Sequence, residues 1–112
     1  MKMRPIALIP EFEHHPWGGT RLIEEYNKPA EQRMISESWE LCCKGKHLTR
    51  VDDVLCPSTL SETLKKYGWR ETIGTLWNSY EDFPLLVKLI DASHDTPVSV
   101  CPDEQYAREH ED

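Results

Sequence analysis

The stretch Phe83-Pro84-Leu85-Leu86-Val87-Lys88-Leu89-Ile90 decides the fold, because it is the longest apolar run in the chain and has the length of a strand. So apolar a run is typical of a strand that other elements cover on both faces, and we predict a buried strand over Phe83–Ile90. Lys88 places one cation in the middle of the run. Burying its ammonium costs free energy unless it reaches water, a carboxylate or a bound anion, so the sequence predicts one of these partners for Lys88.

Other strands are predicted before and after this run. Arg4–Pro10 contains apolar residues between prolines, and the polar residues that follow it are expected to form a loop. Ser36–Cys43 alternates imperfectly, with Trp39 and Leu41 on one face and Glu40 on the other. Shorter extended pieces are predicted over Val51–Leu55 and Val98–Val100.

Helices are predicted between these strands. Thr59-Leu60-Ser61-Glu62 matches a capping box, in which Thr59 and Glu62 satisfy each other's backbone N–H groups, and Gly68 ends the helix that follows. Thr20 is predicted as the N-cap of a short helical segment over Leu22–Tyr26. Further helical segments are predicted over Trp69–Trp77 and from Pro102 onward. The predicted fold class is α+β, mainly β, with two or three short helices.

Length and charge exclude several classes of protein. The 112 residues suit one domain, so residues 1–112 are expected to form a single domain. The net charge of -7, from 13 basic and 20 acidic residues, would repel nucleic acid and anionic membranes. No apolar stretch has the roughly 20 residues that cross a bilayer. The four cysteines form no Cys-x-x-Cys pair, and no export signal is indicated, so we expect free thiols and a cytoplasmic protein.

Several motifs, taken in order, resemble one family. They are Trp17-Gly18-Gly19-Thr20-Arg21-Leu22, Ser36-Glu37-Ser38-Trp39-Glu40-Leu41, Thr59-Leu60, Phe83 to Ala92, Pro102-Asp103 and Tyr106-Ala107. In this order and spacing, the sequence resembles the type I mannose-6-phosphate isomerases, specifically the N-terminal part of their catalytic domain. The resemblance implies a partial cupin-type jelly-roll β-sandwich. It also implies a zinc enzyme that interconverts mannose 6-phosphate and fructose 6-phosphate through an enediol.

The metal ligands of the family are mostly missing from this sequence. Where the family has Gln-x-His-Pro-Asp, this chain matches best with two residues deleted, which removes the glutamine and puts Cys101 in place of the histidine. An ungapped match instead puts Ser99 at the glutamine and again Cys101 at the histidine, so the glutamine is lost either way. A thiolate binds zinc, which makes Cys101 the candidate metal ligand. The family's next ligand would lie beyond Asp112. We therefore expect that this chain does not hold zinc stably, and we assign no catalytic residue.

Two residues are candidate substrate-binding residues through the resemblance. Lys88 matches the lysine placed to hold the substrate phosphate, and Trp17 would border the sugar pocket. Structural alternatives stay open: Lys88 extending its ammonium to water, Trp17 anchoring a turn, and Cys101 as a buried structural thiol. Glu40 is weighed as a pocket group against a solvated carboxylate, and all five histidines are expected at the surface.

Three hypotheses of function remain open. The leading one is a truncated or degenerate mannose-6-phosphate isomerase homologue that is inactive as this chain alone. The second is a non-catalytic module that binds a hexose 6-phosphate through Lys88. The third is a structural module that forms a homodimer, or is completed by another chain, through exposed strand edges, because an incomplete jelly roll leaves backbone groups unpaired.

Overall fold

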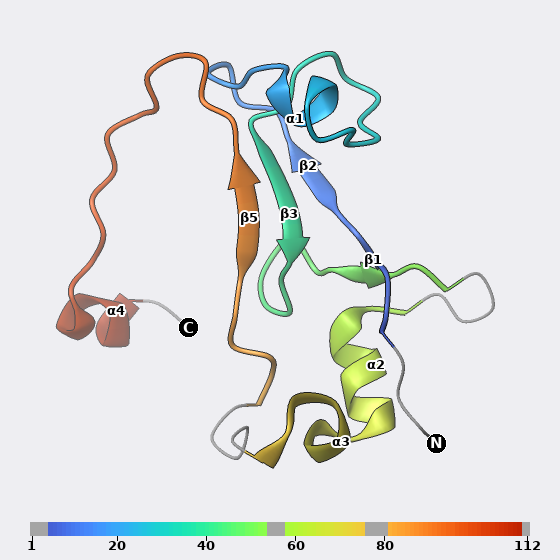
Figure 1. The fold of residues 1–112 in the computed structure, drawn as a ribbon. Coiled ribbons are helices and arrows are strands. Elements are labelled where there is room, and N and C mark those ends of the chain that lie inside the picture. Colours follow the sequence, from blue (N-terminus) through green and yellow to red (C-terminus); the bar gives the residue numbers. More distant parts are fainter. Residues whose placement is uncertain (1–4, 54–57, 76–80, 111–112) are drawn as a thin grey trace.

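The computed structural model describes residues 5–53, 58–75 and 81–110 of the chain. Within them the fold is a small mixed α+β arrangement of two antiparallel sheets and four short helices (Figure 1). The strands are β1 (Leu8–Ile9), β2 (Glu11–Glu13), β3 (Glu37–Leu41), β4 (Arg50–Val51) and β5 (Val87–Ile90). The helices are α1 (Arg21–Glu24), α2 (Leu60–Tyr67), α3 (Trp69–Ile73) and α4 (Glu104–His110).

The larger sheet has the strand order β2-β3-β5, with both pairings antiparallel and β3 in the centre. Glu11 of β2 lies opposite Trp39 of β3, and Trp39 lies opposite Lys88 of β5. Residues that face each other across a sheet point to the same side, so these three side chains share one face. Phe12 and Leu89 lie on the other face by the same alternation.

Two fully buried serines lie at the start of β3, and the first of them joins it to the end of β2. Ser36 and Ser38 have no exposed area, so their hydroxyls need partners inside the protein. The Ser36 hydroxyl donates to the backbone oxygen of Glu13 at 2.9 Å and accepts from the backbone N–H of His15 at 2.9 Å. The Ser38 hydroxyl donates to Glu40 Oε1 at 2.6 Å. Both polar side chains are thereby satisfied.

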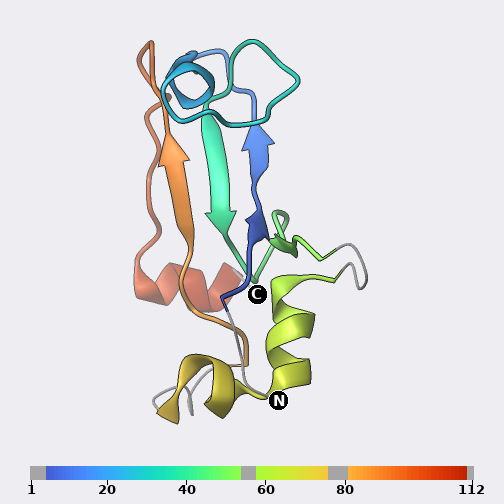
Figure 2. The same cartoon turned by 45° about the vertical axis from the view of Figure 1, so that its right-hand side comes forward.

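The apolar core lies at one end of the larger sheet, where α2 and α3 pack near the β1–β4 pair (Figures 1 and 2). The capping box predicted for α2 is confirmed: the Thr59 hydroxyl accepts from the Glu62 backbone N–H, and the Glu62 carboxylate accepts from the Thr59 backbone N–H. The predicted end at Gly68 is confirmed too. The buried core residues here are Cys43, Val51, Leu60 and Leu64.

The apolar run forms a shorter and less buried strand than predicted. Only Val87–Ile90 is strand, and the preceding residues join no ladder, in keeping with Pro84, which lacks a backbone N–H. Cover on both faces is wrong for the described chain, because Val87 is 47% and Ile90 is 54% exposed. β5 is an outer strand of its sheet, which explains this exposure.

Three other strand predictions were also inexact. Glu11–Glu13 was expected to be loop, yet it forms β2, because backbone pairing with β3 outweighs its low apolar content. The strand predicted over Val98–Val100 is absent, and Val98 and Val100 are 99% and 91% exposed. Of the predicted Arg4–Pro10 strand, the described part contains β1 alone.

The fold class needs a similar correction. More described residues lie in helices than in strands, and four short helices are present rather than two or three, so "mainly β" is wrong for this part of the chain. The jelly-roll sandwich is not confirmed by the two small sheets and stays a prediction. Residues 76 and 77 of the predicted second helix and residues 54 and 55 of the predicted extended piece lie outside the described residues. None of the described helices has the length and apolarity to cross a bilayer.

The loop that contains Gly18 lies directly on the larger sheet. Gly18 forms a bridge with Ala92, and Gly19 forms one with Ile35. A Cβ atom on Gly18 would lie 2.8 Å from the backbone Cα and N atoms of Ser36. Because the buried backbone of Ser36, just before β3, cannot move aside like a flexible side chain, only glycine allows this contact.

We predict that Gly18→Ala destabilises the protein by about 1–3 kcal/mol, the usual cost of forcing an extra methyl into a packed site. Urea unfolding followed by circular dichroism measures the change. Thr20→Ala is the control from the same loop; Thr20 makes no side-chain cap, so its effect should stay within about 0.5 kcal/mol. Equal unfolding midpoints for the two variants would contradict the prediction.

Candidate functional site

Lys88 finds its predicted partner in a carboxylate. Its Nζ donates to Glu37 Oε1 at 3.0 Å and lies 4.6 Å from the ring centroid of Trp39. The side chains of Lys88 and Glu37 are 30% and 11% exposed. The ion pair and the cation–π contact together compensate the partly buried ammonium, which still reaches solvent.

Glu37 also orients the tryptophan beside it. The indole Nε1–H of Trp39 donates to Glu37 Oε2 at 2.9 Å, so the two carboxylate oxygens hold different side chains. We call the side of the sheet that carries these groups the polar face. Its polar and aromatic members are Glu11, Glu13, Glu37, Trp39 and Lys88, and Ile90 lies on the same side, opposite Glu37.

His47 packs against this polar face from the loop after β3. Its ring centroid lies 4.5 Å from that of Trp39, its Nδ1 lies 2.9 Å from Glu11 Oε2, and its Nε2 lies 2.7 Å from Glu13 Oε1. The side chain is only 11% exposed, so the prediction of five surface histidines is wrong for His47. Sequence reasoning missed it because the two glutamates were taken as loop residues; recognising them as period-two strand positions would have put both on one face.

Lys46 completes the group at this edge. Its ammonium donates to Glu13 Oε1 at 2.9 Å. This hydrogen bond and charge, with smaller contributions from His47, lower the pKa of Glu13 below its usual value although desolvation opposes them. The Glu13 carboxylate is therefore ionised near neutral pH.

Trp17 lies half-buried in the loop that meets the end of β5. Its ring stacks on His15 with centroids 5.1 Å apart, and its backbone oxygen accepts from the N–H groups of Ser93 at 2.9 Å and His94 at 3.2 Å. These contacts are those of an anchor between two loops. They do not join Trp17 to Lys88, whose own contacts lead to Glu37 and Trp39.

Cys101 lies on the segment between β5 and α4, which runs away from the end of the sheet (Figure 1). The thiol is free and the residue is exposed, so the alternative of a buried structural thiol is wrong. Cys101 lines a shallow depression, and all the other residues that line it come from the same segment or from α4. These are Val100, Pro102, Asp103 and Tyr106.

The candidate metal ligand is not joined by further donors. Within residues 5–53, 58–75 and 81–110, no three His, Cys, Asp or Glu side chains are grouped so that they could hold a metal ion. A zinc site needs three or four such ligands converging on one point. The described donor set therefore does not fit the zinc site that the resemblance implies.

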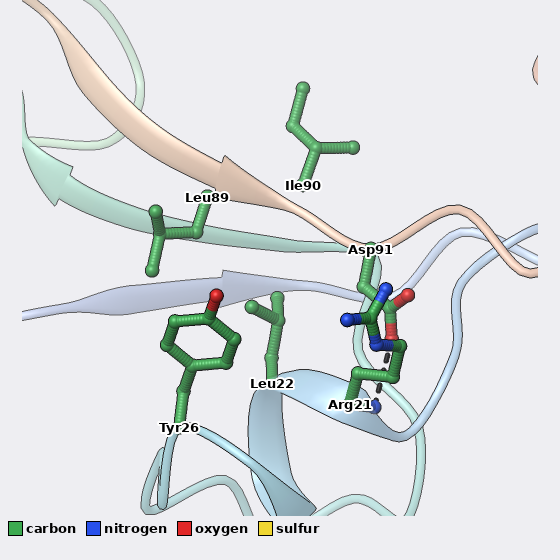
Figure 3. A pocket seen from close by; sticks show the side chains of 6 residues that line it. All are labelled: Arg21, Leu22, Tyr26, Leu89, Ile90 and Asp91. Carbon is green, nitrogen blue, oxygen red and sulfur yellow. Dashed lines mark hydrogen bonds between the residues drawn. The ribbon is translucent and has the colours of Figure 1, made fainter.

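A small cavity lies between α1 and the end of β5 (Figure 3). The Asp91 carboxylate, 7% exposed, accepts from the backbone N–H of Arg21 at 2.9 Å at one side of it. Its volume of about 120 Å³ is well below the roughly 300 Å³ at which small-molecule pockets begin, so it cannot enclose a hexose phosphate. Leu89 lines it from the sheet face opposite Lys88. The full lining is Arg21, Leu22, Tyr26, Leu89, Ile90 and Asp91.

Comparison with known proteins finds relatives of one kind. "Probable mannose-6-phosphate isomerase GmuF" of Bacillus subtilis is 33% identical over 96% of this chain and 33% of its own length. "Mannose-6-phosphate isomerase ManA" of the same species is 32% identical over 99% of this chain and 34% of its own length. The mannose-6-phosphate isomerase of Streptococcus mutans is 31% identical over 96% of this chain and 33% of its own length.

No family model and no solved structure matches the chain. The chain spans about a third of the length of the curated relatives it matches. Identity of 31–33% along nearly all of this chain, shared with several such enzymes, confirms the resemblance found in the sequence motifs. Over about a third of their length, this chain is homologous to mannose-6-phosphate isomerases.

Proposed function

We propose that this chain is a degenerate homologue of the mannose-6-phosphate isomerases that does not isomerise a sugar phosphate by itself. The observation that carries this proposal is the placement of two candidate residues. Lys88 is held by Glu37 on the sheet, whereas Cys101 is exposed on a segment that leads away from it (Figure 1). Isomerisation of mannose 6-phosphate, the reaction after which the relatives are named, requires carbonyl polarisation and proton transfer at the same site. Catalysis by a metal ion needs several ligands around that ion.

The proposal predicts no isomerase activity for the purified chain. Incubated with Zn²⁺ and mannose 6-phosphate, it should form fructose 6-phosphate no faster than a protein-free blank. A full-length mannose-6-phosphate isomerase run in parallel shows that the coupled assay works. Zinc-dependent product formation that is abolished by Cys101→Ser would overturn the proposal and identify Cys101 as a ligand.

We further propose that the chain retains binding of a hexose 6-phosphate through Lys88. The polar face offers a cation that is still 30% exposed beside a large aromatic ring, a combination that suits a phosphate next to a sugar. A dianionic phosphate would share the ammonium with Glu37, whose carboxylate lies 3.0 Å away. Trp17 is proposed to border the same ligand, from the loop between β2 and α1, whose backbone contacts Ser93 and His94 beyond β5.

Calorimetric titration tests this binding. Mannose 6-phosphate should release heat, and Lys88→Ala should weaken binding about tenfold or more, the equivalent of one charge-assisted hydrogen bond. Lys88→Arg, which keeps the charge, should preserve most of the affinity. Lys66→Ala is the matched control, because Lys66 is an exposed lysine of α2. Heat that is identical for mannose and mannose 6-phosphate, or unchanged in Lys88→Ala, would contradict a phosphate site at Lys88.

The exposed edge of β5 favours a second candidate function, that of a structural module that pairs with another copy of this chain. β5 is an outer strand, and Val87 and Ile90 leave apolar surface open. Two β5 strands can pair antiparallel about a two-fold axis, which is the commonest symmetry of homodimers. Such pairing would satisfy the outer backbone groups of both strands.

Sedimentation equilibrium measures the assembly. The chain should sediment with twice the mass of one copy, and Ile90→Lys should shift it to the monomer because a charge at an edge strand opposes pairing. Leu85→Lys is the control, since Leu85 is also exposed but precedes the strand. A strictly monomeric chain that unfolds cooperatively would exclude this function.

A further inference from the structure

The loop between β3 and β4 is built as a short strap. We define the strap as Lys44–Leu48. Its base is closed by two hydrogen bonds, from the Thr49 backbone N–H to the Cys42 oxygen at 2.8 Å and from the Cys42 backbone N–H to the Thr49 hydroxyl at 2.7 Å. Gly45, with φ of +84°, lies in the turn and has open space around it. The base is thus fixed, while a side chain at Gly45 would meet no described atom within 4 Å.

His47 is the residue of the strap that is buried against the sheet. Each of its ring nitrogens lies within 2.9 Å of a different carboxylate oxygen, Glu11 Oε2 at Nδ1 and Glu13 Oε1 at Nε2. A neutral imidazole has one N–H and one lone pair, so it can donate to only one carboxylate. Both contacts are favourable only when the ring is an imidazolium or when one carboxyl group is protonated.

The groups around the His47 ring carry charges of both signs. From β2, Glu11 and Glu13 face its two nitrogens, and Lys46 of the strap itself donates to Glu13. The Lys46 contact lowers the pKa of Glu13, which therefore stays ionised. The other elements packed against this group present Trp39 and Glu37 from β3 and Lys88 from β5, the last two paired with each other.

Docking of the strap also controls access to Trp39. The His47 ring lies 4.5 Å from the Trp39 ring, and the Lys88 ammonium lies 4.6 Å from it. Trp39 is thus contacted by two side chains, His47 and Lys88, that come from different elements. Moving the strap would uncover the part of the indole that His47 covers while leaving the Lys88–Glu37 pair in place.

We propose that the strap is a pH-sensitive cover of the polar face, held on Trp39 by the imidazolium of His47 and released when that imidazolium loses its proton. A neutral ring would turn a lone pair towards an ionised carboxylate, and at 11% exposure water has little room to intervene. The strap is therefore docked at low pH. It opens as the pH rises and the imidazolium gives up its proton.

Nuclear magnetic resonance of the full chain tests this cover directly. The indole Nε1–H signal of Trp39, assigned with Trp39→Phe, is followed from pH 5 to pH 8 beside the imidazole signals of His47. Both signals should shift with one common pH midpoint. Above that pH, the backbone amide hydrogens of the strap should exchange faster with solvent. In Glu11→Gln the midpoint should move to lower pH, because one close opposite charge is lost.

Two variants make the outcome decisive. His47→Gln should leave the Trp39 signal constant with pH, whereas His14→Gln should leave the wild-type titration unchanged. His14 is a suitable control because it is exposed and its ring nitrogen lies 3.1 Å from the backbone oxygen of Met34, not from a carboxylate. A wild-type Trp39 signal that does not change between pH 5 and pH 8, or a change that persists in His47→Gln, would overturn the proposal.

Discussion

The carboxylate of Glu37 is the group on which the larger sheet depends. It is 11% exposed, and a carboxylate so buried is tolerated only when charges and hydrogen bonds compensate it. Lys88 of β5 supplies the charge, and Trp39 of β3 supplies the second hydrogen bond. The same three side chains therefore join two strands, position the aromatic ring and keep the ammonium within reach of solvent. The polar face owes its arrangement to this compensation.

The elements with strong local signals were predictable from the sequence. The capping box of Thr59 and Glu62 determines where α2 begins, since both hydrogen bonds form between residues three apart. β3 was predictable from its alternation. β2 was not, because Glu11–Glu13 becomes a strand only through pairing with β3, a contact that no local pattern encodes. Nor could the sequence predict that Val98 is exposed, because apolar composition alone does not show whether another element covers a segment.

The candidate site was predictable in part for the same reason. A lysine inside an apolar run demands a partner, and Lys88 has one, but the sequence did not reveal that the partner is Glu37 rather than a ligand. Glu40 was weighed instead; it contacts Ser38 and Lys28. His47 was overlooked because its two carboxylates lie 34 and 36 residues away along the chain. Long-range charge compensation thus accounts for most of what sequence reasoning missed.

The anchoring of the Gly18 loop has a consequence for the order of folding. Ser93 donates to the backbone oxygen of Gly18, and Asp91 accepts from Arg21, across 75 and 70 residues. Closing loops of that length costs chain entropy before the contacts at their ends can stabilise the fold. Proteins rich in such long-range contacts therefore fold slowly. Helix α2, by contrast, is stabilised by neighbours in sequence. We therefore expect α2 to form early and the seam between the two distant segments to be the last part of the sheet to assemble.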